Sequence, residues 1–222
     1  FKDETSVSFV AGKGSVHPSH VSRAQKRDDI SALKFGIIYG ANASGKSNVI
    51  KAIALLQQIA LGRFPIGDFK PFKLVKPIKL VSKIEIEFKT DGRYFAYGVE
   101  FSANGIKEEW LYEINARSDK KIFTRKTDSD GNQFEFGDIH GDNSVGQFVK
   151  FLGAGTPAKR SFLAEYIERN GKGLCPIKVA YQWFATGLRI IFPGTRFRGL
   201  SFNAEQDEKF HESTHRLLQY FN

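Results

Sequence analysis

Apolar and polar residues alternate along the middle third of the chain, which is the pattern of β-strands with one covered face. Polar turns interrupt the alternation at Asp91-Gly92, Asn104-Gly105 and Asp130-Gly131. Such pairs supply the positive backbone torsions that tight hairpins need. We therefore predict an antiparallel meander whose strands cover residues 84–88, 94–101, 106–114, 121–125 and 133–136.

The first third of the chain combines extended and helical patterns. Residues 5–10 alternate and predict a strand with one covered face, whereas the mostly apolar residues 33–39 predict a buried strand that stops at Gly40. Between residues 47 and 61, apolar residues recur every three or four positions, as one face of a helix requires. Gly62 is the expected stop of this helix.

The last third predicts mainly helices. Thr156-Pro157 is typical of a helix start, with threonine as the N-cap and proline at the first helical position, and we expect this helix to run to about residue 170. Helical spacing continues at residues 177–188 and 210–221, with a short strand expected at 189–192. The patterns thus divide the chain into sections 1–62, 63–138 and 139–222, of which the second is the antiparallel β section and the third is mainly helical.

Residues 40–47 read Gly-Ala-Asn-Ala-Ser-Gly-Lys-Ser, which has the spacing G-x-x-x-x-G-K-S of a phosphate-binding P-loop. Gly40 and Gly45 permit close approach of the backbone to a triphosphate, so that the amides of about residues 42–47 point at it. Lys46 then reaches the β- and γ-phosphates, and Ser47 offers its hydroxyl to Mg²⁺. The motif needs a strand before it and a helix after it, and both are predicted here.

The loop therefore predicts an ATP site with Mg²⁺. Lys46 and Ser47 are the expected catalytic residues, and Ser47 is also the expected metal ligand. Asn48 is expected to tie the loop to the helix that follows. The residues expected to hold the nucleotide are Gly40, Ala41, Asn42, Ala43, Ser44, Gly45, Lys46, Ser47 and Asn48.

The run from Phe35 to Ile53 resembles the P-loop of the AAA-named, ABC-type ATPases related to SMC, RecF and OLD proteins. Loops of that group favour Asn-x-Ser-Gly-Lys-Ser-Asn, which stands here at residues 42–48. The resemblance implies an α/β fold of the P-loop NTPase class, an ABC-type ATPase head lobe with an antiparallel β meander and a helical section. Less specific likeness extends over residues 1–4, 97–101, 109–112, 160–164 and 181–184.

This resemblance further implies that residues 1–222 are the N-terminal part of one ABC-type head, in which two ATP molecules are clamped between two subunits. We then expect a homodimer or higher homo-oligomer that controls an effector such as a nuclease, in bacterial anti-phage defence, with DNA or RNA as a further partner. The alternative is a RecF-like or SMC-like DNA repair ATPase that acts directly on DNA.

Such a head also needs a Walker B strand that ends in Asp-Glu and a Ser-Gly-Gly signature segment, which do not occur in this sequence. The residues at hand therefore hold no evident base for hydrolysis. The chain contains no methionine and opens at Phe1 within what looks like a strand. We therefore expect a longer polypeptide, with the Walker B and signature segments beyond Asn222.

The formal net charge of +9 favours an anionic partner, nucleic acid first. Lysines recur between residues 70 and 83, but Pro71 and Pro77 prevent one continuous helical stripe. For this segment we expect a solvated loop that leads into an edge strand, with DNA binding as the alternative. No apolar run is long enough to span a membrane, and the first residues do not resemble a secretory leader. A cytoplasmic protein without membrane contact is expected.

Residues 211–215 match H-E-x-x-H, in which two histidines one turn apart bind zinc and the glutamate activates water. His211, Glu212 and His215 are therefore candidates for a metallohydrolase site, although no third ligand follows them in the sequence. An exposed helix face is the alternative. His17 and His20 lie in a loop without neighbouring cysteines or carboxylates, which disfavours a metal role.

The single cysteine, Cys175, cannot build a disulfide framework and is expected to be a small buried apolar residue. Most aromatic residues alternate with polar residues in the meander, so we expect them to pack in the core rather than stack on bases. Tyr94 and Tyr97 are the candidates for surface contacts.

Overall fold

The computed structural model describes residues 4–12, 17–23, 30–64, 66, 81–115 and 117–195, together with residues 212, 215, 216 and 219. It forms two compact units, Phe1–Leu188 and Arg189–Asn222. In the second unit, residues 189–195 are irregular, so the strand predicted at 189–192 is wrong. The helix predicted at 210–221 lies outside the described residues, except for the four separate positions 212, 215, 216 and 219, which are helical.

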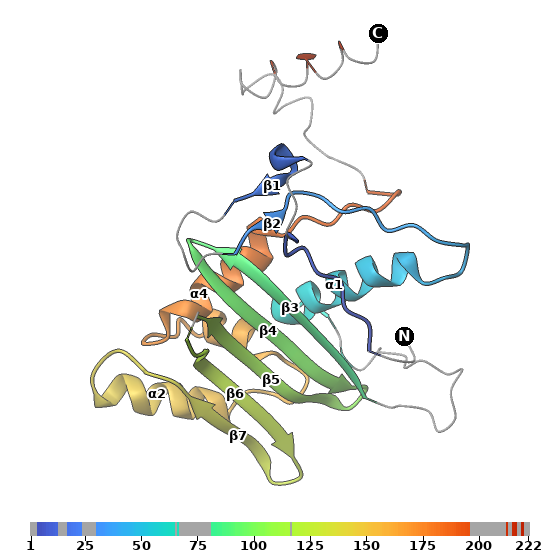
Figure 1. Cartoon of the computed structure of the whole chain (residues 1–222). Helices are drawn as coiled ribbons and strands as arrows, with labels where there is room; N and C mark the ends of the chain where they lie inside the picture. Colours follow the sequence, from blue (N-terminus) through green and yellow to red (C-terminus); the bar gives the residue numbers. More distant parts are fainter. Residues whose placement is uncertain are drawn as a thin grey trace. The chain divides into compact units, whose positions relative to one another are not determined.

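The meander predicted from the alternating pattern is confirmed. Its five strands form one antiparallel sheet in sequential order, from β3 at one edge to β7 at the other (Figure 1). At the first hairpin, Asp91 and Gly92 both adopt positive φ angles, 49° and 71°, as this tight turn requires. The strands are β3 (Ser82–Thr90), β4 (Arg93–Ser102), β5 (Gly105–Ile114), β6 (Lys120–Asp128) and β7 (Gly131–Phe136).

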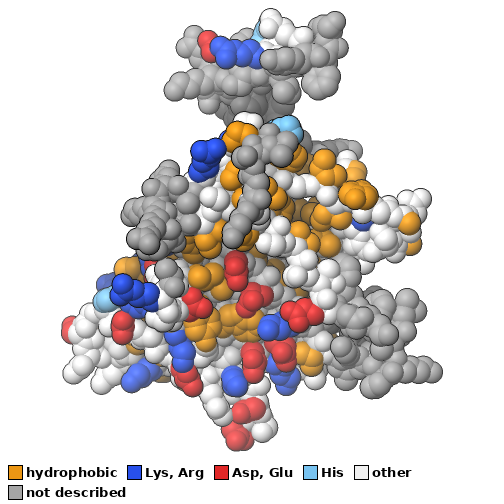
Figure 2. Space-filling model, viewed as in Figure 1, with side chains coloured by type: hydrophobic (Ala, Val, Ile, Leu, Met, Phe, Trp, Pro, Cys, Tyr) orange, Lys and Arg blue, Asp and Glu red, His pale blue; other side chains and the backbone are white. Residues whose placement is uncertain are grey.

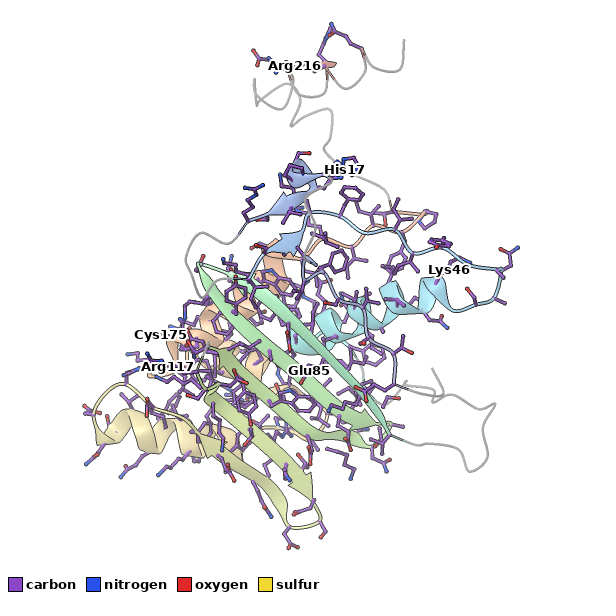
Figure 3. All side chains as sticks on the ribbon, in the orientation of Figure 1. His17, Lys46, Glu85, Arg117, Cys175 and Arg216 are labelled. Carbon is purple, nitrogen blue, oxygen red and sulfur yellow. The ribbon has the colours of Figure 1, made fainter. Side chains whose placement is uncertain are left out.

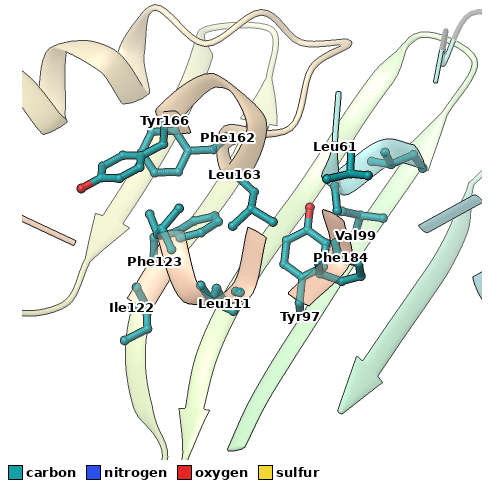
Figure 4. Packing of buried hydrophobic residues seen from close by; sticks show 14 of the residues in the cluster. Leu61, Tyr97, Val99, Leu111, Ile122, Phe123, Phe162, Leu163, Tyr166 and Phe184 are labelled. Atoms are coloured by element: carbon teal, nitrogen blue, oxygen red, sulfur yellow. The ribbon is translucent and has the colours of Figure 1, made fainter. Parts of the chain in front are cut away.

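One face of this sheet carries the hydrophobic core. Along β4, every second side chain from Phe95 to Phe101 is fully buried, including Tyr97 and Val99. These residues pack with Leu61, Phe162 and Phe184 from the helices (Figure 4). Tyr97 is therefore a core residue, and its prediction as a surface contact is wrong.

The helix predicted after the P-loop is confirmed as α1 (Lys46–Ala60). Its C-terminal half is anchored, because Leu56, Ile59 and Ala60 are buried in the core. The Gln57 side-chain amide donates to the carbonyl oxygens of Phe184 and Leu188, at 2.7 and 2.9 Å. The N-terminal half of the helix is more exposed, so α1 holds the loop out from the body of the unit (Figure 1).

Three further helices cover the inner face of the sheet: α2 (Asn143–Ala154), α3 (Phe162–Glu168) and α4 (Cys175–Gln182), the last continued by a π-helical turn, Trp183–Gly187. The last of these agrees with the helix predicted at 177–188. Helix α2 was not among the predicted elements. Its N-cap is Asp142, whose carboxylate accepts from the backbone amides of Ser144 and Val145 in the first turn.

The helix start predicted at Thr156 is wrong. Ser161 is the N-cap of α3, and its hydroxyl accepts from the Ala164 amide at 3.2 Å. The Thr156 hydroxyl instead donates to the Leu152 carbonyl at the end of α2, at 2.8 Å. Thr156-Pro157 is thus part of the turn between two helices, a setting in which proline is equally favoured because it ends the preceding helix.

A buried carboxylate joins the sheet to α3. Glu109 of β5 is fully buried and accepts from the backbone amides of Phe162 and Leu163, at 2.7 and 3.2 Å. It also accepts from the Tyr97 hydroxyl at 3.1 Å and forms an ion pair with Arg125 at 3.6 Å. Burial, partly offset by Arg125, raises the pKa of the Glu109 carboxyl above its ordinary range.

Arg125 of β6 extends this connection to the turn before α3. Its guanidinium is fully buried and donates to the carbonyl oxygens of Arg160 and Pro157, at 2.8 and 3.1 Å. The buried charges of Arg125 and Glu109 are therefore compensated by several hydrogen bonds as well as by each other. Together they fix the position of α3 on the sheet.

The N-terminal segment forms only a small pairing. Strands β1 (Val21–Ser22) and β2 (Ala32–Leu33) are antiparallel, and Val10 bridges to Ala32. The continuous strand predicted at residues 5–10 is therefore wrong. Pairing stops at Lys34, whose amide donates to the His20 carbonyl at 2.9 Å.

The strand predicted at 33–39 is regular only at its start. Residues 35–39 are extended toward the P-loop but exposed, with 79% of Ile37 and 90% of Tyr39 accessible to solvent. The predicted burial of this segment is therefore wrong. Among the residues that the structure describes, no strand lies beside the segment to cover it. An apolar extended segment of this kind is typical of a strand inside a sheet that is covered on both faces.

Cys175 also differs from its prediction. It is the first residue of α4 and is exposed, while Ile177 and Ala180 on the other side of the helix enter the core. Helical periodicity, rather than the tendency of free cysteine to be buried, decides its position.

Candidate nucleotide-binding loop

Residues 40–45 curve from the extended segment 35–39 into α1. Gly45 is the N-cap of the helix and adopts a left-handed conformation with φ 94°, which favours glycine. Gly40 lies close to Ser44, because a Cβ atom at position 40 would be 3.0 Å from the Ser44 hydroxyl oxygen. The two motif glycines therefore have distinct steric reasons to be glycine.

Ala43, at the tip of the loop, has φ 64°. A left-handed conformation costs a residue with a side chain about 1–2 kcal/mol. The loop carries this strain at the position between its two glycines. Alanine has no preference for such a conformation, so the residue type at position 43 gives no sign of this strain.

The ammonium group of Lys46 lies within the curve of the loop. It donates to the carbonyl oxygens of Gly40 and Ala41, at 2.7 and 2.6 Å. Figure 3 shows Lys46 at the N-terminal end of α1, at the far end from the buried half of that helix. A positive charge is therefore concentrated where the first turn of α1 also presents its amides.

Backbone hydrogen bonds shape the rest of the loop. The Ser44 amide donates to the Ala41 carbonyl at 3.3 Å, and the Asn48 amide donates to the Gly45 carbonyl at 2.8 Å. The first amides of a helix have no acceptor within the helix, and its dipole places partial positive charge at this end. Because residues 40–44, 47 and 48 are exposed, an anion can reach these groups from solvent.

The structure therefore brings the nine predicted site residues, 40–48, together on one loop and the first turn of α1. The arrangement fits a polyphosphate, since it combines backbone amides, one ammonium group and close approach at two glycines. The hydroxyl of Ser47, on the first turn, is the group that fits a Mg²⁺ ion bound to the phosphates.

The sequence matches the family described as "AAA domain, putative AbiEii toxin, Type IV TA system" over residues 35–162, more than half of the chain. The chain belongs to this family of AAA-type P-loop ATPases. Membership implies nucleotide binding, usually with Mg²⁺. No curated protein and no solved structure matches the chain significantly.

The family match covers more than the P-loop. It begins at the exposed segment 35–39, includes the P-loop and all five strands of the meander, and reaches the start of α3. The meander is thus part of the region that matches the AAA family. The described residues contain no helix long and apolar enough to cross a membrane.

The outer face of the meander has a mixed charge pattern. Across four strands, Lys83, Glu100, Glu108 and Lys126 are successive register partners, so two glutamates lie side by side between two lysines. Figure 2 shows acidic and basic side chains mixed over the part of this face that is in view. This pattern does not favour nucleic acid, which requires a surface of predominantly positive charge.

Trp110 covers the centre of that face. Its ring lies against Gly98, where a Cβ atom would be 2.2 Å from the ring, so only glycine fits. The indole N–H donates to Glu85 at 2.5 Å, and the Lys83 ammonium lies 5.0 Å from the ring centre. Trp110 is therefore held by its own strand neighbours and is not free to stack on a base.

Two pairs of histidines, apart from the nucleotide loop in the sequence, are candidate metal ligands. Within the described part of the chain, no group of three or more His, Cys, Asp or Glu side chains is arranged to hold a metal ion. His17 and His20 stack on each other with ring centres 5.1 Å apart, without a carboxylate ligand. His211 lies outside the described residues, so the H-E-x-x-H site stays a prediction, while Glu212 and His215 are exposed.

Proposed function

We propose that this AAA domain is the ATP-binding part of an ATP-hydrolysing switch of the ABC type, related to SMC, RecF and OLD proteins. The observation that carries the proposal is the position of Lys46, held in the curve of residues 40–45 at the exposed start of α1. A triphosphate in this curve would replace the two carbonyl oxygens as the partner of the ammonium group.

Each residue of the loop then has a role. The amides of about residues 42–47 bind the phosphate oxygens, and Lys46 contacts the β- and γ-phosphates. The Ser47 hydroxyl holds Mg²⁺, which neutralises charge on the phosphates when bound. The backbone amide of Asn48 donates a hydrogen bond to the Gly45 carbonyl, which fixes the first turn of α1 to the end of the loop.

The Walker B and signature segments that an ABC-type head uses for hydrolysis do not occur in this sequence, and we propose that they lie beyond Asn222. The exposed segment 35–39 supports this arrangement, because a strand next to it would cover Ile37 and Ile38 and would end near the P-loop. Strands on both sides of this segment would complete the sheet that its apolar sequence predicts.

We further propose that ATP clamps two copies of the head together and that this closure controls an effector such as a nuclease, in anti-phage defence. The family description, which names a toxin of type IV toxin–antitoxin systems, supports a role in defence. The mixed charge on the outer face of the meander gives no support to the alternative, a repair ATPase that binds DNA directly through this face.

The first test is nucleotide binding by Lys46→Ala. This change removes the charge that faces the phosphates, so we expect the affinity for Mg-ATP to fall by about 100-fold or more, as for loss of a charge-assisted contact of about 3 kcal/mol. Isothermal titration calorimetry of the full-length protein measures it. Lys51→Ala is the matched control, because Lys51 is exposed on the next turn of α1. Equal affinities of Lys46→Ala and the wild type would refute the assignment of the site.

A further inference from the structure

Strand β7 is an edge of the sheet. Among the described residues, its hydrogen-bonded neighbour is β6 alone. An edge strand directs half of its backbone N–H and C=O groups away from the sheet, and these groups are ready to pair with another extended chain. Figure 1 shows β7 at the end of the sheet, next to α2.

Helix α2 and β7 are held together at a fixed spacing. The Asn132 side-chain amide of β7 donates to carbonyl oxygens at the end of α2 and just beyond it, closest to Thr156 at 2.6 Å. Gly153 faces β7, since a Cβ atom there would be 3.0 and 3.1 Å from the rings of Phe136 and Phe134. The two elements therefore form a preorganised pair rather than two independent surfaces.

A cavity of about 490 Å³ opens between β7 and α2. Its apolar part is formed by Phe134, Phe136 and Ile139, with the two phenylalanine rings stacked 5.2 Å apart. From α2 come Ala154 and Lys150, whose side chain is exposed. Within the described residues the lining includes no acidic side chain, so the charge of the cavity is positive.

We propose that β7 and α2 form a binding groove for an extended peptide segment of a partner protein, which pairs with the β7 edge as an additional strand. One apolar side chain of this segment enters the cavity over Phe134 and Phe136, and an acidic side chain next to it pairs with Lys150. Strand addition of this kind takes its affinity from main-chain hydrogen bonds and its selectivity from pockets for alternate side chains. The groove is independent of the nucleotide loop.

The charge of the groove decides between partners. A basic or neutral segment would leave Lys150 without a counter-charge, whereas an acidic one supplies it. The edge itself favours an extended segment over a helix, because a helix has no free backbone groups to pair with β7.

A random heptapeptide display library, selected on the full-length chain, tests the proposal. We expect the enriched peptides to alternate apolar residues with Asp or Glu. A synthetic copy of the most enriched peptide should bind, and N-methylation of its central amides should weaken binding by about tenfold or more, measured by fluorescence anisotropy.

Variants of the groove complete the test. Lys150→Glu should lower the affinity for the acidic peptide by about tenfold. It should raise the affinity for a copy of the peptide with lysine in place of its acidic residues. Ala154→Trp, at an exposed position, should block the cavity without disturbing the core. Lys178→Glu, at an exposed position on α4, is the charge control and should bind like the wild type.

Three results would overturn the proposal: no peptide enriched on the wild type over Ala154→Trp, binding that tolerates N-methylation, or no charge preference in Lys150→Glu. Self-association of the chain that Ala154→Trp abolishes would also overturn it, because it would assign the groove to a second copy of this chain. Circular dichroism of each variant confirms that it is folded.

Discussion

At the scale of single residues, Glu109 connects two parts of the chain that are far apart in sequence. Its carboxylate accepts hydrogen bonds from the backbone amides of Phe162 and Leu163 in the first turn of α3, in addition to the helix's own N-cap. The buried Arg125 lies beside it. The surroundings stabilise the negative charge, but burial opposes it more strongly and raises the pKa of Glu109. The stability of the AAA domain should therefore depend on pH through this one group.

Glu109→Gln tests this dependence. Above the ordinary Glu pKa of 4.5 the unfolded chain loses a proton that the folded chain still holds, so the contribution of Glu109 to stability falls as pH rises through its raised folded pKa. The free energy of unfolding of the wild type minus that of Glu109→Gln should therefore decrease across this window, by up to about 1.4 kcal/mol per pH unit.

Urea unfolding at a series of pH values, from the ordinary Glu pKa of 4.5 upward, measures this difference. Glu108→Gln, on the outer face of the same strand, is the control for loss of a carboxylate, since an exposed ion pair contributes less than about 1 kcal/mol. A difference that is constant with pH, or that increases, contradicts the prediction.

The place of residues 40–48 on one loop and the first turn of a helix was predictable, because phosphate binding requires particular residue types at fixed spacing within one short segment. Glu109 and Arg125 were not predicted, because their role depends on contacts with α3, more than 30 residues further along the chain. The burial of Tyr97 does not follow from the sequence for another reason: alternation shows that a strand has two faces but not which one is covered.

At the scale of elements, α1 is held at one end only. Gln57 is the polar part of this anchor, since it donates to two carbonyl oxygens at the π-helical turn and its end. Gln57→Leu keeps the side-chain volume and removes both donors, so we expect the free energy of unfolding to fall by about 1–3 kcal/mol. Thermal or urea unfolding measures the loss.

Gln58→Leu is the matched control for this change, because Gln58 is the next residue of α1 and is also half-buried. Its effect should stay within about 0.5 kcal/mol. Equal losses in the two variants would show that the two hydrogen bonds of Gln57 contribute nothing specific.

The meander and α1 were predictable because their patterns are local: strand alternation is bounded by Asp-Gly and Asn-Gly turns, and helical spacing is bounded by glycine. The start of α3 was not, because Thr156-Pro157 fits the end of one helix as well as the start of another. The exposure of residues 35–39 differs from the prediction for a third reason. Their apolar sequence predicts burial, but burial requires neighbouring strands, and sequence alone does not say where these come from.

At the scale of the whole molecule, the proposed clamp predicts a change in mass. Full-length protein with Mg²⁺ and a non-hydrolysable ATP analogue should double its mass in light scattering after size exclusion, whereas Lys46→Ala should not. If the wild type binds the analogue in calorimetry without a change in mass, the assignment of the nucleotide site is supported, but the proposal that ATP clamps two copies together is wrong.

The sheet also relates the two proposed sites. Helix α1, which carries the P-loop, contacts the edge strand β3, while the peptide groove lies at the opposite edge, β7. Strands β4, β5 and β6 lie between these two edges. A shift of α1 relative to β3 would therefore have two routes to the groove: across the sheet, or through the helices, since α1 contacts the π-helical turn and contacts continue from there through α4 and α3 to α2.

The two tryptophans of the sequence report on different sides of that sheet. Trp110 lies on the outer face beside a carboxylate and an ammonium group, whereas Trp183 stacks on Phe88 at 4.0 Å within the helical layer. Their indoles thus sit in surroundings of unlike polarity, and their emission maxima should differ. Intrinsic fluorescence therefore gives the protein two built-in optical probes, one for each face, without any attached dye.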